Sequence, residues 1–105
     1  MANNLFANPM VITGSMATSY KTQMAAAGKI GTLFTLIVEK IYWENPQTAG
    51  DTINIGDPNS GLTLLALRCE NANQSQVIDW TANPKLWNDF EIDTFGSGTL
   101  YIYTR

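Results

Sequence analysis

Residues 39–69 read EKIYWENPQTAGDTINIGDPNSGLTLLALRC, and the pattern of this stretch decides the fold class. Three segments rich in β-branched, aromatic and aliphatic residues are separated by two segments that contain Pro and Gly. Ile53 and Ile55 alternate with polar neighbours, which is the period of two that a half-buried β-strand shows. In the second separator, Pro58 presets the φ angle of a turn and Gly61 supplies a permissive backbone. The stretch therefore predicts three strands joined by two tight turns.

The same signals predict further strands on both sides of this stretch. The predicted strands fall at residues 9–13, 30–44, 51–56, 62–69, 76–80, 90–95 and 99–104. In the last of them, Leu100 and Ile102 are predicted to face one side, and Tyr101 and Tyr103 the other. The Gly-Ser-Gly sequence at residues 96–98 predicts a hairpin turn between the final two strands.

Two segments allow more than one interpretation. Residues 30–44 are apolar on both faces up to Val38, which predicts either a strand buried on both sides or a strand broken by a bend. Residues 15–28 carry three large apolar residues at helical spacing, but they also alternate as a strand would. Because the rest of the chain has a β pattern, we expect a strand or an extended arm at residues 15–28.

The whole pattern predicts an all-β fold in a single domain. Short strands with turns at regular spacing indicate an antiparallel β-sandwich or jelly roll of about eight strands. The length of 105 residues and the mass of 11.6 kDa fit one domain. Within it, we expect residues 1–15 to form an N-terminal arm with the first strand, and residues 16–105 to form the sandwich.

The composition excludes several function classes. The net charge is −3, without a cluster of Lys or Arg, so we expect no nucleic-acid partner. The chain has no run of about 18 apolar residues, so we expect no membrane partner. It has no histidine and a single cysteine, Cys69, which we expect to be a buried thiol. The usual general bases and zinc ligands are therefore missing, and we predict no enzyme activity, cofactor or metal.

Four acidic residues near the C-terminus suggest one enzymatic alternative. Asp79, Asp89, Glu91 and Asp93 are close enough in sequence to form the carboxylate pair of a glycosidase. However, Glu91 and Asp93 alternate with apolar residues, as the solvated face of a strand would. We therefore favour a structural interpretation of all four.

The aromatic residues offer a better argument for binding. Trp43 is in phase with Ile41 and is expected in the core. Tyr42, Tyr101 and Tyr103 are out of phase with the core positions, so they belong to a second face that is open to water or meets another subunit.

The two remaining tryptophans support an alternative function. Residues 81–88 are predicted to be a longer connection because they contain Asn-Pro; this connection carries Trp87, and Trp80 and Trp87 flank its Pro-containing loop. Such a pair of rings can stack on sugars. A carbohydrate-binding module is therefore the alternative hypothesis, with Trp80 and Trp87 as its glycan platform.

Residues 40–65 and the C-terminal strand resemble a recurring pattern in small virion proteins of tailed bacteriophages. That pattern has a K-I-x-W strand, a T-A-G-D turn, a second short strand, a D-x-x-x-G turn and a third apolar strand. The matching residues here are Lys40, Ile41, Trp43, Thr48, Ala49, Gly50, Asp51, Asp57 and Gly61. The ending SGTLYIY at residues 97–103 is similar to the closing strand of the same proteins.

This resemblance implies a structural capsid decoration (cement) protein with a β-sandwich or jelly-roll fold. Such proteins form dimers or trimers over the joints between coat subunits, so the implied partners are the major capsid protein and further copies of this chain. The implied location is the outer surface of the virion, after synthesis in the host cytoplasm. We expect Leu5, Phe6 and Met10 in the arm to contact the coat, and Tyr42, Tyr101 and Tyr103 to lie between copies.

Overall fold

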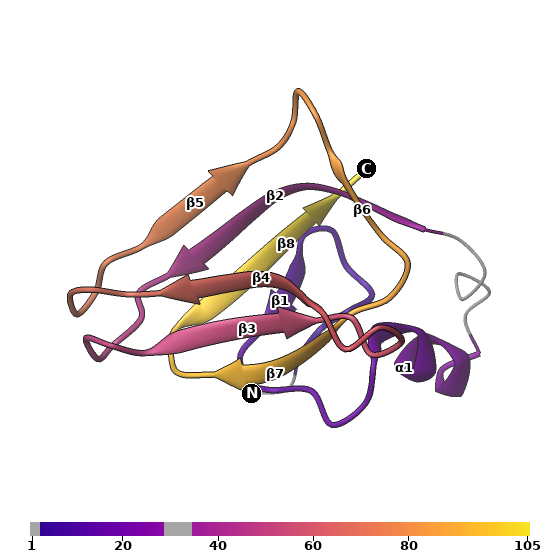
Figure 1. The fold of residues 1–105 in the computed structure, drawn as a ribbon, viewed down its shortest axis with the longest axis horizontal. Coiled ribbons are helices and arrows are strands. Elements are labelled where there is room, and N and C mark those ends of the chain that lie inside the picture. Colours follow the sequence, from indigo (N-terminus) through magenta and orange to yellow (C-terminus); the bar gives the residue numbers. More distant parts are fainter. Residues whose placement is uncertain (1–2, 29–34) are drawn as a thin grey trace.

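The computed structural model describes residues 3–28 and 35–105, so residues 1, 2 and 30–34 of the predicted arm and strand lie outside the described part. Within that part the chain forms eight strands in two antiparallel sheets, with one short helix (Figure 1). The elements are β1 (Met10–Ile12), α1 (Tyr20–Ala26), β2 (Leu36–Glu44), β3 (Thr52–Gly56), β4 (Thr63–Arg68), β5 (Gln76–Asp79), β6 (Lys85–Trp87), β7 (Glu91–Phe95) and β8 (Thr99–Thr104). The prediction of an all-β sandwich is confirmed.

The two sheets differ in width. The large sheet has the order β1-β8-β2-β5, and β6 also pairs with β2. The small sheet has the order β4-β3-β7. Because β5 pairs with residues 40–43 of β2 and β6 pairs with residues 36–38, these two strands run one after the other along the same edge. Together they occupy one strand position.

This strand order is that of a jelly roll with one position left without a strand. The first strand, β1, pairs with the last strand, β8, as two interlocked Greek keys require. The missing strand would lie beside β7 in the small sheet. Its place is taken by the segment before α1, where the backbone N–H of Met16 donates to Ile92 O (3.0 Å) and that of Tyr20 donates to Phe90 O (2.8 Å).

The prediction of a strand or extended arm at residues 15–28 is wrong, because the chain forms helix α1 there. Ser19 is the N-cap residue, and its side chain accepts a hydrogen bond from Thr22 N at 3.3 Å. Asp89 Oδ1 accepts from Lys21 N at 2.9 Å, although the two residues are 68 positions apart. One face of the helix, with Tyr20 and Met24, is buried. A capping group so distant in sequence cannot be recognised from the local pattern.

We expect Asp89→Ala to destabilise the fold by about 1–2 kcal/mol, because it leaves two buried N–H donors without an acceptor. Asp89 Oδ1 also accepts from Phe90 N at 2.9 Å, and the side chain is buried. The free energy of unfolding in urea measures the loss. Asp89→Asn keeps an oxygen at the same place and should cost clearly less. Equal losses for the two variants would contradict the capping role.

A β-bulge in β2 explains its sequence pattern, which would place apolar residues on both faces if the strand were regular. The pairing of β2 with β8 shifts register between Val38 and Lys40. A shift of one residue exchanges the two faces of a strand. Leu36 and Val38 therefore point into the same core as Ile41 and Trp43, and all four are buried. Of the two alternatives for this strand, the bend is the one that the structure shows.

The buried apolar residues form one core between the sheets, closed at one end by α1 and by the N-terminal segment. They are Leu5, Met10, Ile12, Met16, Tyr20, Met24, Leu36, Val38, Ile41, Trp43, Ile53, Ile55, Leu67, Cys69, Trp87, Phe90, Ile92, Leu100 and Ile102. Ile53 and Ile55 face inward as predicted, and so do Leu100 and Ile102. The predicted core position of Trp43 and the buried Cys69 thiol are also confirmed.

The Gly-Ser-Gly segment is not the hairpin turn that the sequence predicts. It carries the chain from β7 in the small sheet to β8 in the large sheet. Groups from β2 and from the β2–β3 connection hold it: Trp43 Nε1 donates to Ser97 O (2.8 Å), the Ser97 hydroxyl bonds the Asp51 carboxylate, and Gln47 N donates to Ser97 Oγ (2.7 Å). These contacts join strands that the local sequence cannot identify as neighbours.

Candidate functional site

The outer face of the large sheet carries a row of large side chains across four strands. Val11 on β1 pairs with Tyr101 on β8, Tyr101 pairs with Tyr42 on β2, and Tyr42 pairs with Val77 on β5. The neighbours of Val11, Tyr42 and Tyr101 on their strands are core residues, and Val77 is 58% exposed, so the row points away from the core. We call this row, together with Lys40 and Tyr103, the tyrosine face.

Contacts between the side chains of the tyrosine face hold them in place. The rings of Tyr42 and Tyr101 are stacked, with centroids 5.8 Å apart and an interplanar angle of 16°. The ammonium group of Lys40 lies 4.4 Å from the centroid of the Tyr103 ring, within the range of a cation–π interaction. The Tyr101 hydroxyl bonds the Glu44 carboxylate at 3.4 Å. A face of this kind is ordered before it meets a partner, which lowers the entropy cost of binding.

The electrostatics of the tyrosine face involve Tyr101 and three charged side chains. Desolvation raises the pKa of Tyr101, and the nearby Glu44 carboxylate raises it further. Lys40 is paired in register with Tyr103 on one side and with Asp79 on the other. Hydrogen bonds from the Thr81 hydroxyl and backbone N–H lower the pKa of Asp79. The face therefore presents aromatic surface with a cation between Tyr103 and Asp79, an arrangement that suits protein contact.

The predicted coat contacts in the N-terminal segment are only partly at the surface. Phe6 is 55% exposed, but Leu5 and Met10 are 4% and 2% exposed and belong to the core. The prediction is therefore wrong for Leu5 and Met10 as surface contacts. The reason is that the segment folds back on the sandwich: Asn4 and Val11 exchange two backbone hydrogen bonds, at 2.7 and 2.9 Å.

The described part of the N-terminal segment is not a free arm. The Asn3 side chain accepts from Thr13 N (2.7 Å) and Gly14 N (3.1 Å). The Asn8 amide makes two hydrogen bonds with the backbone of Thr104, at 2.7 and 3.0 Å. The predicted division into residues 1–15 and 16–105 thus has no counterpart in the packing, because residues 3–14 lie against the sandwich and contribute to its core.

Trp80 and Trp87 do not form the predicted glycan platform. Trp87 lies in β6, a strand that the sequence analysis missed, and it is 4% exposed and tilted against Phe90. Trp80 is half-buried and meets Trp87 edge-on, at an interplanar angle of 72°. A stacking platform needs open rings, and this pair packs ring edge against ring face.

The four acidic residues lie in three different settings. Asp79 is in β5 of the large sheet, and Asp89 is buried at the start of α1. Glu91 and Asp93 stay neighbours on the outer face of β7, where desolvation and the carboxylates of Asp93 and Asp89 raise the pKa of Glu91. In residues 3–28 and 35–105, no three Cys or acidic side chains are grouped in a way that could hold a metal ion.

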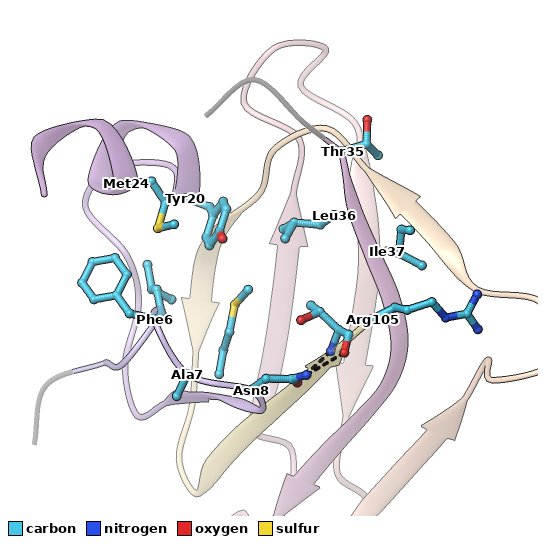
Figure 2. A pocket seen from close by; sticks show the side chains of 12 residues that line it. Phe6, Ala7, Asn8, Tyr20, Met24, Thr35, Leu36, Ile37 and Arg105 are labelled. Atoms are coloured by element: carbon cyan, nitrogen blue, oxygen red, sulfur yellow. Dashed lines mark hydrogen bonds between the residues drawn. The ribbon is translucent and has the colours of Figure 1, made fainter. Parts of the chain in front are cut away.

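A cavity of about 400 Å³ lies between α1 and the N-terminal segment, and the sequence analysis did not predict it. Figure 2 shows its walls, which come from the N-terminal segment, α1, the start of β2 and the C-terminal end of β8. The described lining residues are Leu5, Phe6, Ala7, Asn8, Met10, Tyr20, Met24, Thr35, Leu36, Ile37, Thr104 and Arg105. The paired apolar residues Leu5 and Phe6 in a polar segment are the one sequence signal that pointed here.

Comparison with protein-family models, with curated proteins and with solved structures finds no match to this chain. Among the described elements, α1 has seven residues, and none is a helix of the length and apolar character needed to cross a membrane. The functional argument therefore depends on the surfaces described above.

Proposed function

We propose that this protein is a structural, non-enzymatic capsid decoration (cement) protein of a tailed bacteriophage. In this proposal it binds the outer shell of the virion as a homodimer or homotrimer and stabilises contacts between major capsid protein subunits. The observation that carries the proposal is the tyrosine face, an ordered aromatic surface on the outer side of the large sheet. The resemblance of residues 40–65 and 97–103 to small phage virion proteins is the second support.

The residues of the resemblance belong to the framework that joins the two sheets. Lys40, Ile41 and Trp43 lie in β2, and residues 48–51 lie in the connection from β2 to β3. Residues 57–61 form the β3–β4 hairpin, in which Asp57 Oδ1 accepts from Asn59 N at 2.9 Å. A pattern that serves packing and turns, rather than catalysis, fits a protein that works by presenting surfaces.

The tyrosine face fits contact between copies of the chain. Tyrosine is enriched at protein interfaces because one rigid side chain buries much apolar area and keeps a hydroxyl for hydrogen bonding. Lysine and carboxylates on the same face allow a self-complementary arrangement, in which Lys40 of one copy meets Glu44 or Asp79 of another. The low fraction of charged residues, 14%, agrees with a surface that is partly covered in an assembly.

The first test measures assembly by sedimentation velocity. The double variant Tyr42→Ser, Tyr101→Ser removes the stacked pair, and we expect it to weaken self-association by roughly 30-fold or more, since interface tyrosines contribute about 1–2 kcal/mol each. Leu62→Ser is the matched control, because Leu62 is 68% exposed in the hairpin between β3 and β4 of the small sheet. An unchanged association constant in the double variant would exclude the tyrosine face as the interface.

The second test measures binding to the shell. Purified protein is mixed with expanded empty capsids of its own phage, and the bound copies are counted after co-sedimentation. Saturation at a fixed ratio that matches the symmetry of the shell would support decoration. A few copies per particle would indicate a vertex or the tail, and no binding would overturn the proposal whatever the self-association test shows.

A further inference from the structure

The cavity beside α1 is a separate feature of the molecule, on the inner side of the large sheet rather than on the tyrosine face. Its walls combine apolar side chains, among them Leu5, Met10, Met24 and Leu36, with polar ones such as Asn8 and Thr104. Its volume of about 400 Å³ lies in the range of small-molecule sites.

One polar group in the cavity has no partner among the described residues. Tyr20 is 5% exposed, and its ring is stacked on Phe90 with centroids 5.3 Å apart. Figure 2 shows its hydroxyl pointing into the space between α1 and β2. No hydrogen bond joins Tyr20 Oη to another described residue. Since the described residues contain no wholly enclosed polar side-chain atom without a partner, this hydroxyl is reached from the cavity.

Three other polar side chains of the described lining make hydrogen bonds within the protein. Both the nitrogen and the oxygen of the Asn8 amide bond the Thr104 backbone, and Thr35 Oγ1 donates to Asn88 Oδ1 at 2.9 Å. Arg105 Nε donates to Glu39 Oε1 at 2.6 Å, and in Figure 2 the Arg105 side chain points away from the cavity. An occupant would therefore find apolar side chains beside the Tyr20 hydroxyl, with the Thr104 hydroxyl as a second polar group of the lining.

We infer that this cavity binds a small, uncharged, mainly apolar molecule with one hydrogen-bond acceptor, which the Tyr20 hydroxyl recognises. Burial raises the pKa of Tyr20, so the hydroxyl keeps its proton at neutral pH and acts as a donor. The apolar side chains of the lining contribute affinity, and the Tyr20 hydroxyl distinguishes a ligand with a carbonyl oxygen from a hydrocarbon of the same shape. This inference does not depend on the proposed function.

The test uses the methionine methyl groups as probes. Met10 and Met24 line the cavity, whereas Met16 is buried but is not part of the lining. The full chain is labelled with ¹³C-methyl methionine and titrated with 4-phenylbutan-2-one, and in parallel with n-butylbenzene as the hydrocarbon of similar shape. We expect the ketone to shift the Met10 and Met24 signals with a Kd of about 1 mM or tighter, and to leave Met16 unchanged.

Two variants separate recognition from occupancy. Tyr20→Phe keeps the ring on Phe90 and removes only the hydroxyl, so ketone binding should weaken about tenfold while hydrocarbon binding stays the same or improves. Ala7→Phe fills the rim from an exposed position and should abolish the binding of both compounds. No shift of Met10 and Met24 with the ketone, or an equal response to both compounds that Tyr20→Phe leaves unchanged, would overturn the inference.

Discussion

Gly98→Ala is expected to destabilise the protein by more than about 3 kcal/mol, which is a large part of the roughly 5–15 kcal/mol typical of a small domain. Gly98 has a φ of +79°, a region that side chains with a Cβ rarely adopt. A Cβ there would lie 2.5 Å from Glu44 O, 2.9 Å from Pro46 N and 3.0 Å from Asn45 C. All three atoms are backbone, so a rotamer change cannot relieve the overlap.

Two further glycines allow the backbone cost and the steric cost to be separated. Gly61 has a φ of +75°, and a Cβ added there would meet no described atom within 4 Å, so Gly61→Ala should cost only about 1 kcal/mol. Gly14 has open space and no positive φ, so Gly14→Ala should change stability by less than about 0.5 kcal/mol. Urea unfolding followed by circular dichroism ranks the three. A cost for Gly98→Ala equal to that of Gly61→Ala would refute the close approach of β2 and β8 at this turn.

Trp43→Ala is expected to cost about 4 kcal/mol, because it removes a fully buried indole from the centre of the large sheet's inner face. The side chain also links the two sheets, since its Nε1–H donates to Ser97 O at 2.8 Å. The variant therefore loses apolar burial and leaves a carbonyl oxygen without its donor. Thermal and urea unfolding should both show a protein close to the limit of folding.

Trp43→Phe separates the two contributions. It keeps most of the apolar volume and loses the hydrogen bond, so it should cost about 1–3 kcal/mol. Trp80→Phe is the comparison, because Trp80 is half-buried and no hydrogen bond of its indole is found in the described structure. A larger loss for Trp80→Phe than for Trp43→Phe would mean that the indole–Ser97 bond contributes little to holding the β7–β8 connection.

Local periodicity was enough to predict most strands and their buried faces. Ile53 and Ile55 alternate with polar neighbours, and Leu100 and Ile102 alternate with tyrosines or threonine. When one face of a strand is buried, such alternation favours the orientation in which the aliphatic residues face the core. The same alternation put Tyr101 and Tyr103 on the opposite face, which the structure confirms. The three tyrosines of the tyrosine face were therefore predictable. The stacking of Tyr42 on Tyr101 and the neighbouring residues of the face were not, because they depend on the register between strands.

The sequence left a helix at residues 15–28 as the less favoured alternative and gave no signal for β6, because distant residues decide both elements. Asp89 caps α1 from 68 positions away, and β6 exists because residues 36–38 of β2 offer an edge beside the bulge. Trp87 is consequently a core residue rather than part of a binding platform. In the same way, the backbone pair between Asn4 and Val11 buries Leu5 and leaves Phe6 exposed.

The sequence by itself determined the all-β class, the positions of most strands and the second, tyrosine-bearing face, because each depends on the alternation of neighbouring side chains. Only the tertiary structure decided which strands share a sheet, since the Gly-Ser-Gly segment at residues 96–98 suits a hairpin and a crossing between sheets equally well. It also decided the cavity and the Tyr20 hydroxyl that faces it. These arise where four segments distant in sequence meet, and a local sequence pattern carries no information about such contacts.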